Sequence, residues 1–133
     1  MTIDARLDAV GIVVADMGKA LAFYRALGLP VPADADGQPH VEVPLAGGMR
    51  LLLDTEEVVR SFHPGWRPTP GAGRIGLAMA LPDAAAVDAA YAELTTAGHH
   101  GELAPFDAVW GQRYAVVNDP DGNGVDLFAP LAS

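Results

Sequence analysis

The sequence contains an internal repeat, in which one order of strand and helix patterns occurs twice. This duplication constrains the fold more than any other feature. Residues 7–29 run as an apolar strand, an aspartate, a helical pattern and a glycine. Residues 73–99 repeat those parts in the same order. The repeated order predicts two copies of one supersecondary unit, each with an apolar face to bury.

Both predicted helices carry sequence signals at their ends. Asp16 and Asp83 are expected N-caps, because an aspartate carboxylate accepts hydrogen bonds from the free amides of the first turn. Gly28 and Gly98 are expected just after the helices, where glycine adopts the left-handed conformation without strain. Each helix also has an apolar stripe that should face a core. The stripes are Met17, Ala20, Leu21, Tyr24 and Leu27 in the first helix, and Val87, Tyr91 and Leu94 in the second.

Strand-like segments follow each helix and complete the plan. Residues 40–55 predict a hairpin around Ala46-Gly47-Gly48, and residues 108–129 predict a second hairpin whose turn is 119–124. We therefore predict an α+β fold in which βαβββ is written twice within one domain. The domain is 1–133, with modules of about 5–58 and 73–131 and a Pro- and Gly-rich linker of about 59–72.

Alternation along two predicted strands places bulky residues on one face and small residues on the other. The bulky face should pack on the helices. The small face leaves room for a ligand or for a neighbouring chain, and both interpretations stay open. The bulky sets are Val10, Ile12 and Val14, and Ile75, Leu77, Met79 and Leu81; the small sets are Ala9, Gly11 and Val13, and Gly76, Ala78 and Ala80.

The last predicted strand carries a lone carboxylate. Alternation places Asp126 and Phe128 on one face, with Val125 and Leu127 on the other. Asp126 is then a metal ligand, a group that binds a ligand, or a hydrogen-bonded residue near a dimer seam.

Charge and composition exclude several classes of function. The 17 acidic residues outnumber the 8 basic ones, for a formal net charge of −9. No basic face can follow a phosphate backbone, so we expect no nucleic-acid partner, and the acidity mildly favours cationic partners. The lack of cysteine excludes disulfides, thiolate metal sites and cysteine nucleophiles. No apolar run has the length of a membrane span and no signal-peptide pattern is present, so we expect a cytoplasmic protein without a membrane partner.

Residues 12–29, the Asp-led second helix and residues 110–128 carry the motifs of a known family. In these stretches the chain resembles the vicinal oxygen chelate superfamily, which holds glyoxalase I, extradiol dioxygenases, fosfomycin-resistance enzymes and bleomycin-resistance proteins. The resemblance implies that the two modules form one cupped mixed sheet. It also implies a homodimer with the site inside the cup.

In the metal-dependent members, four strands each supply one ligand, mainly His or Glu. The resemblance carries these positions to Ala9, Leu52, Gly76 (or Arg74 after a shift of two) and Asp126. One carboxylate cannot hold a catalytic cation, so we expect no metal and no other cofactor.

The histidines offer no alternative metal site. His99 and His100 are predicted in a solvated turn, and His40 and His63 in loops. No spacing among them places three ligands on one surface.

A second motif is similar to the bleomycin-resistance-like branch, which does not use a metal. It consists of Val109-Trp110-Gly111, Tyr114 and the turn 119–122, with Val109 where proline is usual. In that branch the tryptophan lines the drug groove. We therefore predict a protein that binds and sequesters an antibiotic-like, planar hydrophobic or cationic ligand, conferring resistance without turnover or catalytic residues.

Two other functions stay open. One is a lyase or isomerase of the same superfamily, metal-independent rather than metal-dependent, that uses Asp126, Tyr114 or a histidine as acid or base. The other is a structural or regulatory dimer with an empty cup.

Flat ligands stack on indole and phenyl faces, so aromatic residues dominate the predicted site. The predicted ligand-binding residues are Trp110, Trp66, Phe62, Tyr114, Asp126, Leu52, Arg50 and Phe128. Several have a structural alternative: Trp110 as an aromatic at the edge of the core, Trp66 as a loop anchor, and Arg50 in a salt bridge with Asp54.

Overall fold

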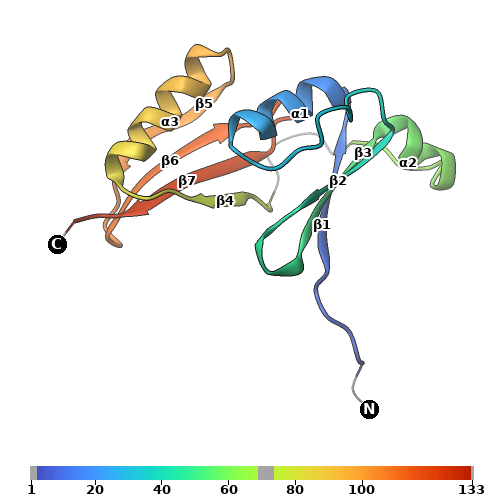
Figure 1. The fold of residues 1–133 in the computed structure, drawn as a ribbon, viewed down its shortest axis with the longest axis horizontal. Helices are drawn as coiled ribbons and strands as arrows, with labels where there is room; N and C mark the ends of the chain where they lie inside the picture. The colour runs from blue at the N-terminus through green and yellow to red at the C-terminus, as the bar shows by residue number, and fades with distance from the viewer. Residues whose placement is uncertain (1–2, 69–73, 133) are drawn as a thin grey trace. The chain divides into compact units, whose positions relative to one another are not determined.

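The computed structural model describes residues 3–68 and 74–132, which divide into a first unit, Met1–Pro68, and a second unit, Thr69–Ser133. Each unit is a βαβββ-like module with a mixed sheet (Figure 1). The predicted α+β class is therefore confirmed, and the two modules are βαβββ-like. Among the described residues, no helix is both long and apolar enough to cross a membrane.

The first unit is built on a three-stranded sheet in the order β1-β3-β2. Its elements are β1 (Ala9–Val14), α1 (Met17–Ala26), β2 (His40–Pro44), the 3₁₀ helix η1 (Ala46–Gly48), β3 (Arg50–Thr55) and α2 (Glu56–Phe62). The central strand β3 is parallel to β1 and antiparallel to β2. Strands β2 and β3 form the predicted hairpin, and Gly47 and Gly48 adopt positive φ in its turn.

The first unit also differs from the sequence prediction in three places. The predicted plan βαβββ has three strands after the helix, whereas only β2 and β3 follow α1 in this unit; residues 30–39, which hold three prolines, form no strand. Helix α2 occupies 56–62, where the sequence predicts the end of a module and the start of the linker. His40, predicted in a loop, is the first residue of β2, where it alternates with the buried Val41 and Val43.

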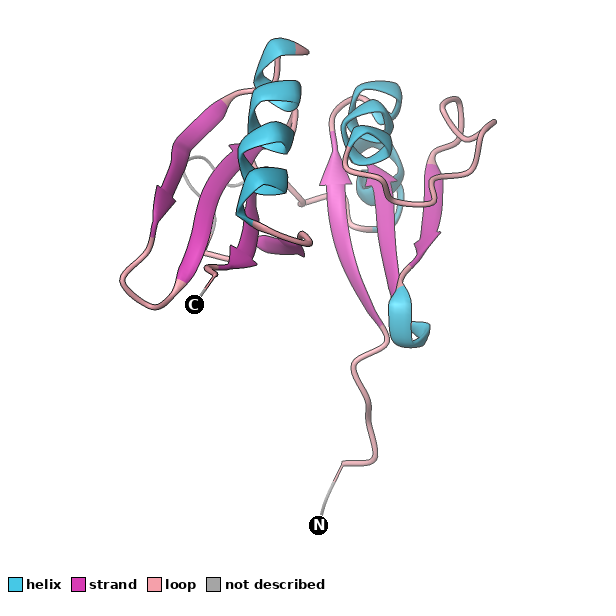
Figure 2. Ribbon diagram, turned by 60° about the vertical axis from the view of Figure 1, so that its left-hand side comes forward, coloured by secondary structure: helices cyan, strands magenta, loops and turns pink. Residues whose placement is uncertain are grey.

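The second unit has a four-stranded sheet in the order β4-β7-β6-β5, and α3 lies across one of its faces (Figure 2). Its elements are β4 (Leu77–Ala80), α3 (Ala84–Thr96), β5 (Gly101–Asp107), β6 (Gln112–Asn118) and β7 (Gly124–Pro130). Strand β7 is parallel to β4 and antiparallel to β6. Ile75, predicted on the bulky face of a strand, instead precedes β4 and is exposed, because the pairing with β7 begins only at Leu77.

The ends of α1 and α3 are confirmed as predicted. The carboxylates of Asp16 and Asp83 each accept a hydrogen bond from the amide three residues later, at 2.9 and 2.8 Å. Gly28 and Gly98 follow the two helices at φ values of 90° and 100°, which a residue with a side chain adopts only with strain.

Each sheet has a buried face and an open face, because side chains alternate along its strands. In the second unit Val117, Val125 and Leu127 are buried, as are Val87 and Leu94 of α3. The residues opposite to them form what we call the second open face: Ala78, Ala80, Phe106, Tyr114, Val116, Asp126 and Phe128. The corresponding first open face holds Ala9, Gly11, Val13, His40, Glu42, Arg50, Leu52 and Asp54.

The predicted turn between β6 and β7 is confirmed, and Asp119 organises it. Its buried carboxylate accepts hydrogen bonds from the backbone amides of Asp121 (3.0 Å) and Asn123 (2.8 Å), and from the Asn123 side-chain amide (2.8 Å). Gly122 takes a φ of 85° in this turn. The turn sets the register of the hairpin, which places Tyr114 opposite Phe128.

Candidate functional site

Three aromatic rings gather at the second open face. Phe106 belongs to β5, Tyr114 to β6, and Trp110 to the turn that joins these strands. Their ring centroids lie 5.4–6.3 Å apart, and the ring planes meet at 72–88°. Such edge-to-face pairs are favoured electrostatically as well as by burial. The cluster therefore positions Trp110, although 59% of its surface is exposed.

The turn directs the indole of Trp110. Gly111 closes the turn at φ 92°, and its amide donates to the carbonyl of Ala108 at 3.0 Å. The indole Nε1–H donates to Oε1 of Gln112 at 2.8 Å. Because this hydrogen bond satisfies the indole N–H, the group that Trp110 offers to a ligand is its apolar ring face.

Tyr114 and Asp126 form a hydrogen-bonded pair on the same face. The hydroxyl of Tyr114 donates to the carboxylate of Asp126. Burial, and then this bond to Asp126, raise the pKa of Tyr114 to about 12. Tyr114 therefore keeps its proton at neutral pH and serves as a donor, and Asp126 contributes a carboxylate acceptor beside the rings.

The surroundings of Asp126 do not fit a metal ion. Ala78 and Val116 lie directly opposite it on the neighbouring strands, and Tyr114 donates to its carboxylate. Divalent cations need several oxygen, nitrogen or sulfur ligands. In the part of the chain that the structure describes, no group of three or more His, Cys, Asp or Glu side chains could hold an ion.

The structure brings four predicted residues of the second unit together, namely Trp110, Tyr114, Asp126 and Phe128. Sequence reasoning missed Phe106. Its strand gives no clean alternation, because the pairing of β5 with β6 shifts register twice between Gly101 and Phe106.

Charged side chains pair across the strands of the first open face. His40 Nδ1 lies 2.6 Å from Asp54 Oδ1, and His40 Nε2 lies 3.1 Å from Glu42 Oε2. Arg50 donates to Glu42 at 2.6 Å and to Asp8, which precedes β1, at 2.5 Å. Asp54, which the sequence predicts as a possible salt-bridge partner of Arg50, instead pairs with His40.

These contacts shift the pKa values of the paired groups. The hydrogen bond with Asp54, followed by that with Glu42, raises the pKa of His40. The bonds from His40 and Arg50 lower the pKa of Glu42. The predicted residue Leu52 lies half-buried on the same face, opposite Glu42. The sequence did carry a signal for His40 and Glu42, since they alternate with buried valines.

Phe62 and Trp66 belong to the end of the first unit. Phe62 is the last residue of α2 and is exposed. Trp66 is half-buried; its amide donates to the His63 carbonyl at 3.0 Å, and the guanidinium carbon of Arg60 lies 5.6 Å from its ring centroid. These contacts are those of a loop anchor, the structural alternative for Trp66.

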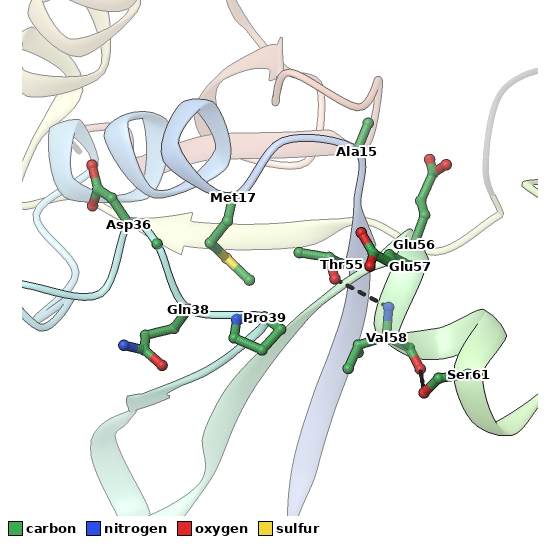
Figure 3. Close-up of a pocket in the computed structure, with 11 residues that line it drawn as sticks. Ala15, Met17, Asp36, Gln38, Pro39, Thr55, Glu56, Glu57, Val58 and Ser61 are labelled. Carbon is green, nitrogen blue, oxygen red and sulfur yellow. Dashed lines mark hydrogen bonds between the residues drawn. The ribbon is translucent and has the colours of Figure 1, made fainter.

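A cavity of about 530 Å³ opens in the first unit, between the start of α1, residues 36–39 and the start of α2 (Figure 3). Met17, Gln38, Pro39 and Thr55 are among the residues that line it. A smaller cavity of about 250 Å³ is lined by Asp34, His40 and Glu42, and Gln38 lines both cavities. Sequence reasoning did not find either cavity, because 36–39 and α2 meet only after β2 and β3 pair.

Comparisons with known proteins agree on one family. The model of the Glyoxalase/Bleomycin resistance protein/Dioxygenase superfamily matches residues 6–127. A comparison with curated proteins finds no match.

Solved structures with the same fold are numerous. A family enzyme from Burkholderia phytofirmans is 21% identical, with a TM-score of 0.81 over 96% of this chain and 100% of that one. A superfamily member from Sphaerobacter thermophilus is 30% identical, with a TM-score of 0.67 over 95% and 98% of the two chains. A lactoylglutathione lyase from Agrobacterium tumefaciens is 22% identical, with a TM-score of 0.66 over 96% and 95%.

Proposed function

Since this chain belongs to the Glyoxalase/Bleomycin resistance protein/Dioxygenase superfamily, we propose that it binds and sequesters a small, antibiotic-like molecule without turnover. The ligand is planar and apolar, or planar and cationic. The observation that carries this proposal is the group formed by Trp110, Tyr114 and Asp126 on the second open face. The exposed indole provides a stacking surface, and the carboxylate provides a partner for a positive charge.

The chemistry of this group favours binding over proton transfer. Tyr114, with a pKa of about 12, holds its proton too tightly to act as a base near neutral pH. Ala78 and Ala80, the cross-strand neighbours of Asp126 and Phe128, have small, exposed side chains. The net charge of −9 also attracts a cationic ligand to the protein.

A ligand screen read by tryptophan fluorescence tests this function. The chain has two tryptophans, so a Trp66→Phe variant leaves Trp110 as the single reporter. Planar cations and neutral planar compounds are titrated in parallel, and we expect saturable quenching by members of this set. Chromatography should recover the bound compound chemically unchanged. Absence of quenching across the whole set would contradict the proposal.

A metal-independent lyase or isomerase is the second candidate. The Agrobacterium relative is named a lyase, and the pair of Asp126 and Tyr114 places a carboxylate beside a proton donor. The recovery experiment separates the two candidates. A quencher that returns as a different compound identifies an enzyme, and one that returns intact identifies a binding protein.

We expect the purified protein to carry no stoichiometric transition metal. Asp126 has Ala78 and Val116 as its cross-strand neighbours, and neither can coordinate a cation. Elemental analysis should find well below one Ni, Zn, Fe or Mn per chain. About one ion per chain, with loss of ligand binding after chelation, would show this expectation to be wrong.

We also propose that the protein is a homodimer. Leu103 and Val109 expose apolar surface in the second unit, and self-association in an isologous pair would cover it. Sedimentation at micromolar concentration should give twice the chain mass of 13.8 kDa. A single monomeric species under those conditions would contradict the proposal.

A further inference from the structure

Five charged groups form a continuous chain across the first open face. Their order is Asp54, His40, Glu42, Arg50 and Asp8, and neighbours along it are 2.5–3.1 Å apart. Asp54 and Arg50 belong to β3, His40 and Glu42 belong to β2, and Asp8 precedes β1. Acidic and basic groups alternate, so the chain of charges links the three strands of the sheet.

His40 is the member of this chain whose charge changes near neutral pH. Each ring nitrogen faces a carboxylate, Asp54 on one side and Glu42 on the other. An imidazolium donates from both nitrogens, whereas a neutral imidazole donates from one and turns a lone pair toward the second carboxylate. Loss of the proton therefore breaks one of the two contacts and leaves two carboxylates facing each other across the ring.

The other charged groups nearby do not replace the lost charge. Arg50 already holds Glu42 and Asp8, and Arg6 lies 3.4 Å from Asp8 at the far end. Asp34, which lines the smaller cavity together with His40, adds a further negative charge on that side.

The pair formed by His40 and Asp54 is next in sequence to two residues that line the larger cavity, Pro39 and Thr55. His40 directly follows Pro39, and Asp54 directly precedes Thr55. The amide of Thr55 donates to the carbonyl of Pro39 at 3.0 Å, and both residues line the cavity (Figure 3). The ion pair and this backbone hydrogen bond are therefore adjacent contacts that join residues 39 and 40 to β3.

We propose that His40, held between Asp54 and Glu42, is a proton-operated latch that keeps residues 36–39, which form one wall of the first-unit cavity, against β3. With the proton bound, residues 36–39 stay attached to β3 through the ion pair of His40 with Asp54 and the hydrogen bond from Thr55 to Pro39. With the proton lost, the contact of His40 with Asp54 weakens, and residues 36–39 separate from Thr55 more often.

The direction of the pH dependence follows from the pKa shifts. The pKa of His40 is raised by Asp54 and then by Glu42, so its contribution to closure is complete below its ordinary value of about 6.5 and is lost as pH rises through the raised value. Arg50 lowers the pKa of Asp8, and His40 together with Arg50 lowers the pKa of Glu42. These two carboxylates therefore stabilise the chain of contacts at a pH above their ordinary pKa values, and this stabilisation is lost as pH falls through the lowered pKa values. The latch is therefore closed between these two limits.

Amide hydrogen exchange of Thr55, expressed as a protection factor, tests the latch in the intact wild-type protein. Because the contacts with Asp54 and Glu42 raise the pKa of His40, the bound proton favours the fastened state, and local opening increases once the proton is lost. We expect the protection factor of Thr55 to fall in step with the titration of His40, as followed by the ring NMR signals of that residue. A flat protection profile in the wild type overturns the proposal without any variant.

Variants assign the effect to this histidine. Asp54→Asn should lower the pKa that NMR reports for His40, and His40→Gln should abolish the step in Thr55 protection. His63→Gln is the matched control, because His63 is exposed beyond α2 and its backbone amide bonds to Val59. The step should persist in this control. A step that survives in His40→Gln, or that disappears in His63→Gln, overturns the assignment.

Discussion

Replacing Trp110 by alanine is expected to weaken ligand binding by about 2 kcal/mol or more, roughly thirtyfold in Kd. The substitution removes the exposed indole face and its edge-to-face contacts with Phe106 and Tyr114. Trp110→Phe keeps an aromatic face and should retain much of the affinity. Calorimetric titration with a ligand identified by the fluorescence screen measures both variants.

Asp126→Asn is the companion test for a cationic ligand. The change keeps the shape of the side chain but removes the charge, and loss of a charge-assisted hydrogen bond costs about 1.5–3 kcal/mol, a ten- to hundredfold weakening. Asp88→Asn is the matched control, because it removes an exposed carboxylate from α3 that pairs with Arg113. Unchanged affinity in both Trp110→Ala and Asp126→Asn, with the fold intact, would mean that the ligand does not bind at the second open face.

Asp119→Ala is expected to lower the free energy of unfolding by about 2–4 kcal/mol. Asp119 is 4% exposed, and its carboxylate accepts three hydrogen bonds from Asp121 and Asn123. Alanine would leave these donors without an acceptor at the tip of the β6–β7 hairpin. Urea denaturation followed by circular dichroism measures the loss.

Asp119→Asn serves as the matched comparison, because asparagine keeps one acceptor oxygen and should show an intermediate loss. If Asp119→Ala cost less than about 1 kcal/mol, the carboxylate would not be the organiser of this turn. The hairpin also carries Tyr114 and Asp126, so weaker ligand binding should accompany the lower stability.

The local elements of the fold could be predicted from the sequence because short-range interactions decide them. Asp16 and Asp83 cap their helices with bonds that reach only three residues along the chain. Residues 119–124 turn because Asp119 binds amides two and four residues ahead. Alternation was sufficient to put Asp126 and Phe128 on one face of β7.

Predictions were weaker where local signals were ambiguous. The sequence predicts the segment 56–62 partly as a linker, although Thr55 caps it as a helix by accepting a hydrogen bond from the amide of Val58 at 3.2 Å. His40 is predicted in a loop, whereas its pairing with Asp54 makes it the start of β2.

By itself, the sequence determined the duplicated plan, the helix ends, the turns and the faces of the strands, because these depend on neighbours within a few residues. Only the tertiary structure decided which side chains share those faces. It joined Tyr114 to Asp126, added Phe106 to Trp110, and linked Asp54 through His40 and Glu42 to Arg50 and Asp8. Cross-strand neighbours follow from sheet order and register, and both are set by contacts between segments far apart in the chain.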